Sequence, residues 1–318
     1  MENTYYDLIL EAEMGDTEAQ LVLSLLYEQD GNYTEAAKWC EMAARQGDPD
    51  AQNRMGIYYA SGQGVEQDDA KSFYWYSEAA DRKNSAAQCN LGYCCLTGIG
   101  MDPAPEQAIP WLERAAEQGS ARAMSLLGSC YRDGDGVEAD AEKAVQWYQK
   151  AADLEYPPAL CSLGLCYERG EGVPEDKARA IALYTQAAQR GDLAAQCNLG
   201  YCYLTGIGVE EDDVQAVRWL TQAAEQDFPR AQRLLGCCCR DGDGTPADAQ
   251  KAVEWFRKAA AQDYPPALCD LGLCYEMGTG VEVDLKRATD LYRRSGERDY
   301  APGQCNLAVC YLNGDGVE

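Results

Sequence analysis

Apolar side chains recur along this chain with the period of an α-helix. In the stretch AMSLLGSCY, Ala123, Leu127 and Tyr131 lie four residues apart, so they fall within about 80° of one another on a helix and form one apolar stripe. Gly128 follows the leucine in the middle of this stretch. Because glycine in a helix interior costs about 1 kcal/mol relative to alanine, we expect another helix backbone to approach there. The pattern predicts a helix from the alanine to the aromatic residue.

A second helical pattern follows each glycine-rich turn. After the turn DGDGV at 133–137, the segment AEKAVQWYQKAA at 141–152 begins beside Asp140, a residue type that caps helix N-termini. Glycines in such a turn can adopt the left-handed conformation that ends a helix. Tryptophan takes one repeated position in the second helix, where we expect it to pack in the core between helices. It occurs as Trp39, Trp75, Trp111, Trp147, Trp219 and Trp255.

The pair of helices repeats every 36 residues, and a repeat of this length indicates stacked helical hairpins. We therefore predict an all-α, right-handed αα-solenoid of about eight 36-residue hairpins with half-repeats at both ends. It would form a single domain over residues 1–318, with units starting near residues 19, 51, 87, 123, 159, 195, 231, 267 and 303. A longer period of 108 residues lies on top, since residues 87–173 match 195–281 at 57 of 87 positions. Blocks of three units were thus duplicated.

The two ends of the sequence each carry half of the pattern. Residues 4–14 look like a lone second helix, and residues 303–312 look like a first helix without its partner. A solenoid needs a polar terminal cap, which this C-terminal half-repeat lacks. We therefore expect the sequence to be part of a longer protein, truncated at its C-terminus.

The repeated pattern resembles the Sel1-like repeat, a relative of the tetratricopeptide repeat, over almost the whole chain. The first unit departs from it, because YEQDGNYTEAAKWC is shorter and lacks the paired glycines. The resemblance implies a non-catalytic adaptor that assembles other proteins. It also leaves open an exported, cysteine-rich member held by disulfides, or the interaction domain of a longer enzyme or effector. Unit 123–158 carries the pattern at Ala123, Leu127, Gly128, Tyr131, Gly134, Gly136, Val137, Asp140, Lys143, Ala144, Trp147, Tyr148, Ala151 and Ala152.

The charge of the chain limits its partners. The formal net charge is −26 and the pI is near 4.3, which opposes binding to nucleic acid or to an anionic membrane. We expect a protein or peptide partner that is neutral or basic. The N-terminal segment MENTYYDLILEAEMGD has neither the basic region nor the apolar run of a signal peptide, and no window is apolar enough for a membrane span. These features favour a cytoplasmic protein.

Histidine is absent from the sequence, which removes the commonest catalytic bases and many metal ligands. We expect no enzyme activity, no metal and no cofactor. Sixteen cysteines are present, most of them two or seven places after the first alanine of a unit, as in Cys89 and Cys94. Two side chains five residues apart on a helix point about 140° away from each other, which is too far for them to share a metal or to form an intrahelical disulfide. Place seven falls beside the buried stripe, whereas place two falls nearer solvent or a neighbouring helix.

Stacked helical hairpins create an extended concave surface, usually lined by the first helices, on which we expect a peptide or partner protein to bind. Counting the alanine as place zero, places two, three, six, nine and ten lie on that side of the helix. Asparagine can pair with a peptide backbone, tyrosine offers amphipathic area, and arginine can bind a carboxylate. The candidate partner-binding residues are Asn90, Tyr93, Arg132, Asn198, Tyr201, Arg233, Arg240 and Asn306.

Overall fold

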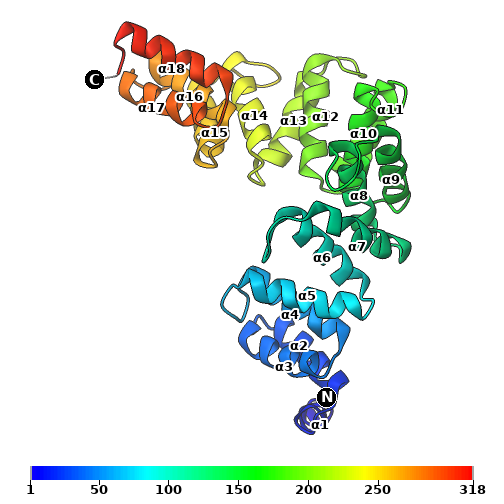
Figure 1. Ribbon diagram of the computed structural model, residues 1–318. Helices are drawn as coiled ribbons and strands as arrows, with labels where there is room; N and C mark the ends of the chain where they lie inside the picture. The colour runs from blue at the N-terminus through cyan, green and yellow to red at the C-terminus, as the bar shows by residue number, and fades with distance from the viewer. Residues whose placement is uncertain (1, 317–318) are drawn as a thin grey trace. The chain divides into compact units, whose positions relative to one another are not determined.

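The computed structural model describes residues 2–316 of the chain. These residues form eighteen α-helices and no strand (Figure 1). The helix α1 (Glu2–Glu13) comes first, eight helical hairpins follow, and α18 (Ala301–Asn313) comes last. The predicted all-α solenoid of eight hairpins with a half-repeat at each end is therefore confirmed. We call the even-numbered helices, which open each hairpin, the A helices, and the odd-numbered ones the B helices.

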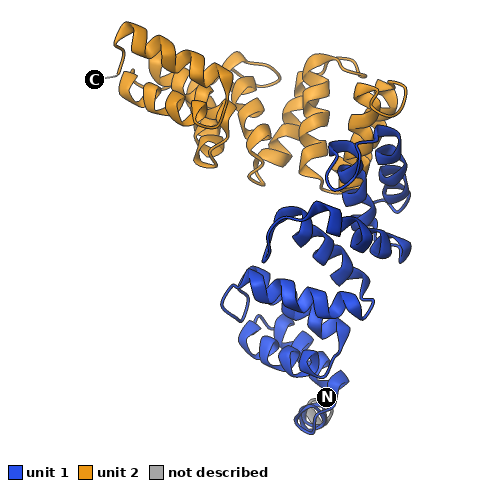
Figure 2. Cartoon of the chain, in the orientation of Figure 1, with its two compact units in different colours: residues 1–156 blue, residues 157–318 orange. Residues whose placement is uncertain are grey.

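The contacts between helices divide the chain into two compact units, residues 1–156 and 157–318 (Figure 2). One continuous domain over the whole chain stays a prediction, and each unit is described by itself. Unit 1 holds α1 and the hairpins α2 (Thr17–Gln29) with α3 (Tyr33–Arg45), α4 (Pro49–Ser61) with α5 (Asp69–Asp81), α6 (Ser85–Thr97) with α7 (Pro105–Glu117), and α8 (Ala121–Asp133) with α9 (Ala141–Asp153). Unit 2 holds the hairpins α10 (Pro157–Arg169) with α11 (Lys177–Gln189), α12 (Leu193–Thr205) with α13 (Asp213–Ala224), α14 (Pro229–Asp241) with α15 (Ala249–Ala261), and α16 (Pro265–Met277) with α17 (Leu285–Gly296), followed by α18.

In seven of the eight hairpins the turn contains two glycines that serve different purposes, and the turn between α2 and α3 lacks this pair. Gly134 ends α8 in the left-handed conformation at φ +80°. Gly136 also has positive φ, and a Cβ there would lie 2.2 Å from the carbonyl oxygen of Pro105 at the start of α7. Asp140 then caps α9, because its carboxylate accepts a hydrogen bond of 3.0 Å from the backbone N–H of Lys143. The paired glycines thus end one helix and let the turn approach the preceding hairpin.

The core lies between the helices of each hairpin and between neighbouring hairpins. In the hairpin of α8 and α9, the apolar stripe predicted from the sequence is buried at Ala123 and Leu127. The tryptophans are only half-buried, and the residue after each of them takes the fully buried position, as Tyr148 does beside Trp147. We expected the tryptophans to fill the core, but the residue that follows each tryptophan takes that position instead. The Trp147 ring instead packs at the edge of the core, with Lys150 Nζ 3.8 Å from its centroid.

Candidate functional site

Hydrogen bonds join successive A helices through one repeated position. In unit 1, Asn90 Nδ2 of α6 donates to Asn53 Oδ1 of α4 at 3.0 Å, and Arg122 Nη1 of α8 donates to Asn90 Oδ1 at 2.6 Å. The asparagine amide therefore bridges the helix before it and the helix after it. Three consecutive hairpins are held together along the face that the sequence predicts for binding.

Unit 2 repeats this arrangement 108 residues later. Arg230 Nη1 of α14 donates to Asn198 Oδ1 of α12 at 2.7 Å, and Asn198 Nδ2 donates to Cys161 Sγ of α10 at 3.6 Å. Asn306 of α18 donates to Cys269 Sγ at 3.3 Å. All three asparagines predicted as partner-binding residues thus have hydrogen-bond partners within the fold, and they connect hairpins.

Two exposed clusters are built on these bridges. Tyr93 is 37% exposed, and the guanidinium carbon of Arg122 lies 5.4 Å from the centroid of its ring. Tyr201 is 36% exposed, and that of Arg230 lies 5.8 Å from its ring. We call Arg122, Asn90 and Tyr93 the first Arg–Asn–Tyr cluster, and their counterparts Arg230, Asn198 and Tyr201 the second. In each cluster the asparagine side chain holds the arginine in place, and the arginine and the tyrosine are both accessible to solvent.

The two arginines of these clusters were missed by the sequence reasoning. Both stand one residue before the first alanine of their unit, at place minus one. At 100° per residue this place falls at about 260°, between place six at about 240° and place three at about 300°. It therefore belongs to the predicted face. Counting the helix from its proline or capping residue, as at Pro229, would have included Arg230.

The other predicted arginines have acidic partners. Arg233 of α14 pairs with Asp270 of α16 at 2.6 Å, and this pair occupies the same inter-helix position as the asparagine bridges. Arg132 binds Asp133 through two hydrogen bonds of 2.8 and 2.7 Å at the C-terminal end of α8. Arg240 binds Asp241 in the same way at the end of α14. In both end pairs the arginine lowers the pKa of the aspartate against a smaller opposing effect of burial.

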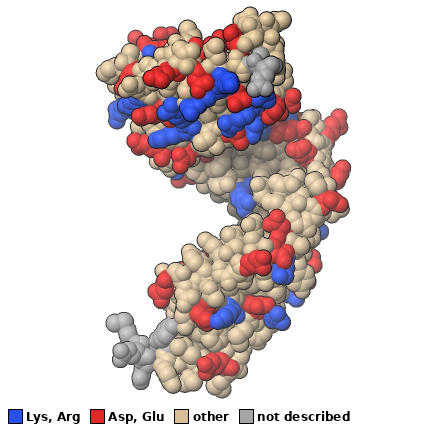
Figure 3. Space-filling view, turned by 90° about the vertical axis from the view of Figure 1, so that its left-hand side faces the viewer, with Lys and Arg blue, Asp and Glu red and all other residues tan. Residues whose placement is uncertain are grey.

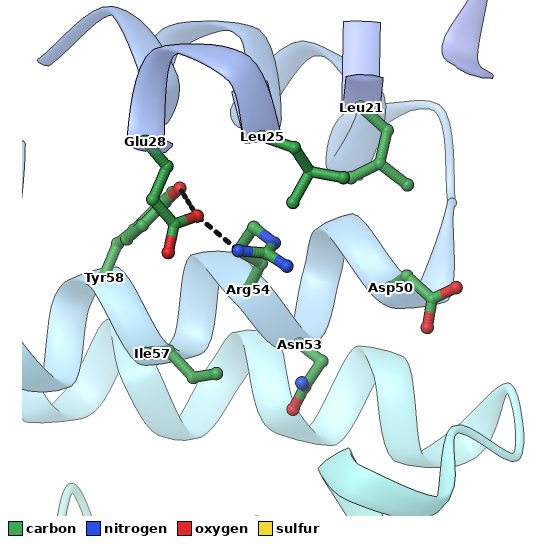
Figure 4. A pocket seen from close by; sticks show the side chains of 8 residues that line it. All are labelled: Leu21, Leu25, Glu28, Asp50, Asn53, Arg54, Ile57 and Tyr58. Atoms are coloured by element: carbon green, nitrogen blue, oxygen red, sulfur yellow. Dashed lines mark hydrogen bonds and ion pairs between the residues drawn. The ribbon is translucent and has the colours of Figure 1, made fainter. Parts of the chain in front are cut away.

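A pocket in unit 1 lies between α2 and α4 (Figure 4). Glu28 of α2 forms an ion pair with Arg54 of α4 and accepts a hydrogen bond of 2.9 Å from the Tyr58 hydroxyl. Burial, and then the hydrogen bond to Glu28, raise the pKa of Tyr58 to about 12, even though Ser24 opposes the shift. The pocket has a volume of about 320 Å³, and its walls are completed by Leu21, Leu25, Asp50, Asn53 and Ile57. It combines apolar area with a fixed carboxylate.

A comparable pocket in unit 2 adjoins the second Arg–Asn–Tyr cluster. It has a volume of about 260 Å³ between α10 and α12, with Arg230 of α14 at its edge. Glu168 of α10 accepts a hydrogen bond of 2.8 Å from the Tyr184 hydroxyl, as Glu28 does from Tyr58. Its other walls are Leu165, Arg169, Asn198 and Tyr201. In each unit the A helices therefore form a hollow that is apolar in part and has charged groups at fixed positions.

The cysteines at place seven lie in the core, as predicted. Cys94, Cys130 and Cys202 are at most 2% exposed, and burial raises the pKa of Cys130 to about 11 and that of Cys202 to about 12. Of the five cysteines at place two, four are buried and Cys305 is exposed. Thiols with such high pKa values stay protonated at neutral pH and are poor nucleophiles.

Metal-binding clusters and membrane-spanning helices are both absent from residues 2–316. No three histidine, cysteine, aspartate or glutamate side chains in this range gather where a metal ion would be held. No helix in the same range is long and apolar enough to cross a membrane.

Known proteins share both the repeat and the fold. A crystal structure of a Sel1 repeat protein from Oxalobacter formigenes is 30% identical, covers 95% of this chain and 90% of its own, and superposes with a TM-score of 0.67. A protective antigen of uropathogenic Escherichia coli, described as displaying an SLR fold, is 30% identical over 98% of this chain and 75% of its own, with a TM-score of 0.61. A comparison with curated proteins gave no match. The family model described as "Sel1 repeat" matches residues 17–48, 49–84, 85–120, 121–156, 157–192, 193–228, 229–264, 265–300 and 301–318. With nine matched repeats, this chain belongs to the Sel1 repeat family.

Proposed function

We propose that this protein is a non-catalytic scaffold that binds a peptide or partner protein on the A-helix face of each unit. Repeats of this class commonly mediate protein–protein interaction and generally form non-catalytic scaffolds. The observation that carries the proposal is the Arg–Asn–Tyr cluster, which occurs once in each unit with the same bridging geometry. A duplicated cluster gives two similar contact points for one ligand type.

The chemistry of the clusters suits a peptide. A guanidinium has five N–H donors, and Arg122 uses one of them on Asn90, so others can reach a peptide carbonyl or carboxylate. Tyr93 adds a large side chain with few rotatable bonds, a type that often dominates binding energy at interfaces. The hollows between neighbouring A helices supply apolar area for side chains of the ligand. A pocket of about 300 Å³ is sized for side chains rather than for a whole domain.

The charge of the whole chain guides the choice of partner. A net charge of −26 repels polyanions at long range and attracts basic segments, so we favour a neutral or basic protein or peptide over nucleic acid or an anionic membrane. A cytoplasmic location and the lack of catalysis belong to the same proposal. The absence of histidine and the raised pKa values of the buried thiols support the latter, since both remove common catalytic groups.

The proposal is tested by comparing partner capture by three forms of the full chain. The variant Y93S/Y201S removes both aromatic side chains of the clusters, and Y74S removes a tyrosine that is 54% exposed on the B helix α5. We expect Y93S/Y201S to weaken the affinity for the partner by about thirtyfold or more, because each lost aromatic anchor costs about 1 kcal/mol or more. Y74S should bind as the wild type does. Equal recovery by all three forms, with unfolding midpoints unchanged, would show that the A-helix face does not bind.

A further inference from the structure

Basic side chains gather at the C-terminal end of unit 2. Five of the 27 lysines and arginines of the chain fall within residues 286–298. Figure 3 looks at this end of the unit, where lysine and arginine side chains lie next to one another in a band. The four arginines of this group form ion pairs with Asp263, Asp284 or Asp290, so the search for an unpaired positive charge turns to the residues beside them. The five residues are Lys286, Arg287, Arg293, Arg294 and Arg298.

Two arginines of this region converge on one tyrosine. Tyr275 of α16 is only 7% exposed, and its hydroxyl oxygen accepts hydrogen bonds from Arg257 Nη2 of α15 at 3.0 Å and from Arg287 Nη1 of α17 at 3.2 Å. The guanidinium carbons lie 6.0 and 5.5 Å from the centroid of its ring. Three successive helices therefore fix two cations around one phenolic oxygen.

Only one of these two arginines has a carboxylate partner. Arg287 Nε lies 3.3 Å from Asp284 Oδ2, whereas no carboxylate within residues 2–316 forms an ion pair with Arg257. Burial acts to raise the pKa of Tyr275, but the hydrogen bonds and charges of the two arginines outweigh it, and the net pKa is lowered. A neutral hydroxyl that is polarised in this way is a weak partner for two cations, and an anion would be a stronger one.

The second arginine is not needed by the repeat itself. Tyr131 and Tyr167, at the same place in other hairpins, have one cation each, Lys143 at 5.4 Å from the Tyr131 ring and Arg179 at 4.3 Å from the Tyr167 ring. The residue 108 positions before Arg257 is Gln149. Since the fold is built elsewhere with glutamine at this position, Arg257 adds charge that the packing does not require.

The space beside these groups is large enough for a small anion. A cavity of about 290 Å³ is lined by Arg257, Tyr275 and Arg287 together with Leu271, Asp290, Leu291 and Arg294. Asp290 already pairs with Arg293 at 2.5 Å, and Arg294 already pairs with Asp263 at 2.5 Å. The acidic group in the wall is therefore neutralised, and the uncompensated charge in the cavity is that of Arg257.

We propose that Arg257, Arg287 and Tyr275 bind a phosphate group, either free or as a phosphorylated side chain of a partner. Two guanidinium forks and one phenolic O–H provide three sets of donors, which match the three terminal oxygens of a phosphate monoester. A single carboxylate offers two oxygens and half the charge. A long polyanion would be repelled by the acidic remainder of the chain, so a compact dianion is the better ligand.

The site is tested by calorimetry on the full chain at constant ionic strength. The probes are inorganic phosphate, acetate, and a short phosphoserine peptide with its unphosphorylated form as control. The variant R257Q copies Gln149 and removes the extra cation, and R179Q removes one cation from the Tyr167 ring as a control of equal charge change. We expect R257Q to weaken phosphate binding roughly tenfold or more, because a charge-assisted hydrogen-bond pair is lost. R179Q should bind phosphate as the wild type does.

The outcomes separate the sources of the phosphate and can overturn the site. Tighter binding of the phosphoserine peptide than of inorganic phosphate would identify a phosphorylated partner, and equal binding would identify a free phosphate compound. Acetate binding as tight as phosphate binding, or an equal loss in R257Q and R179Q, would refute the proposal. The A-helix variant Y93S/Y201S does not change this cavity. The proposal of a phosphate site and the proposal of a binding A-helix face can therefore fail independently of each other.

Discussion

Gly128 of α8 lies so close to the ring of Tyr148 on α9 that a Cβ on the glycine would come within 2.6 Å of the ring atoms Cδ1 and Cε1. The glycines at the equivalent place in other hairpins have the same relationship to a tyrosine, leucine or phenylalanine of the following B helix. The pairs are Gly56 with Tyr76, Gly92 with Leu112, Gly164 with Tyr184, Gly200 with Leu220, Gly236 with Phe256, and Gly272 with Tyr292. In seven of the eight hairpins a large side chain of the B helix therefore rests on a bare glycine backbone, whereas the hairpin of α2 and α3 has Ser24 at this place.

The variant G128A should destabilise the protein. A methyl group gains up to about 1 kcal/mol of helix propensity, but forcing apart a buried ring and a helix backbone costs about 1–3 kcal/mol. We expect a net loss of about 1–2 kcal/mol, seen as a lower urea midpoint. The double variant G128A/Y148A should lose no more than Y148A alone, because the clash is gone. A midpoint equal to that of the wild type in G128A would contradict this packing.

The repeated mid-helix glycine shows which part of the packing could be predicted from the sequence. It correctly indicated a close approach, because glycine in mid-helix needs a compensating reason. The partner was expected to be a helix backbone and is mainly a side chain, with a carbonyl such as that of Ala180 at 3.3 Å from the Cβ position of Gly164 as the second contact. A helical wheel gives the direction in which a side chain points and not the side chain that it meets.

The hydrogen bonds of the asparagines between A helices could not be predicted from the sequence for the same reason. The contact of place three with place two of the preceding A helix depends on how each hairpin is rotated against the next. That rotation arises from the packing of the large side chains. The sequence contains no local signal for it, so residues such as Asn90 were expected to face a ligand and were found to link hairpins.

The pair of Arg233 and Asp270 should contribute more to stability than an exposed pair. Their side chains are 29% and 13% exposed and connect α14 to α16, so removing one partner leaves a half-buried charge. In a double-mutant cycle with R233A and D270A we expect a coupling free energy of about 1–2 kcal/mol. The same cycle on Arg240 and Asp241, which are 37% and 45% exposed, should give less than about 1 kcal/mol. Equal coupling in the two cycles would show that the bridge position has no special effect.

Replacing Asn90 should cost more than replacing Asn306. Asn90 makes two hydrogen bonds to groups on neighbouring helices, including one to a guanidinium, whereas Asn306 donates to the weak acceptor Cys269 Sγ. We expect N90A to lower the free energy of unfolding by about 1–3 kcal/mol and N306A by under about 1 kcal/mol. Urea unfolding of the two variants checks the difference, and a larger effect of N306A would be inconsistent with the bridges.

Thiol reactivity should distinguish Cys305 from the buried cysteines. Cys305 is the exposed one among the sixteen, and Cys237 is half-buried. With a chromogenic thiol reagent at pH 8, we expect one fast reaction in the native protein, lost in C305S, and sixteen reactive thiols after unfolding without reductant. A lower count in the unfolded chain would instead support the exported, disulfide-linked alternative. Loss of the fast phase in C237S rather than in C305S would contradict the burial found here.

Stability should fall at alkaline pH because of the buried thiols. Burial raises the pKa of Cys130 to about 11 and that of Cys202 to about 12, from 9.0 for an exposed thiol. The unfolded chain therefore loses these protons first, so this contribution to stability is complete below about pH 9 and is lost as the pH rises toward 11–12. Each such thiol should remove about 1.4 kcal/mol per pH unit within that window.

Urea midpoints at pH 7.5, 9, 10 and 10.5 measure this loss. Tyrosines with raised pKa values, such as Tyr58, act in the same direction only above their ordinary value of 10, so the interval from pH 9 to 10 reports mainly on the cysteines. The variant C130A/C202A should be less stable at pH 7.5 because of the lost methyl-sized volume, yet its midpoint should fall less steeply between pH 9 and 10. Identical slopes in the variant and the wild type would show that Cys130 and Cys202 do not contribute to the alkaline loss of stability.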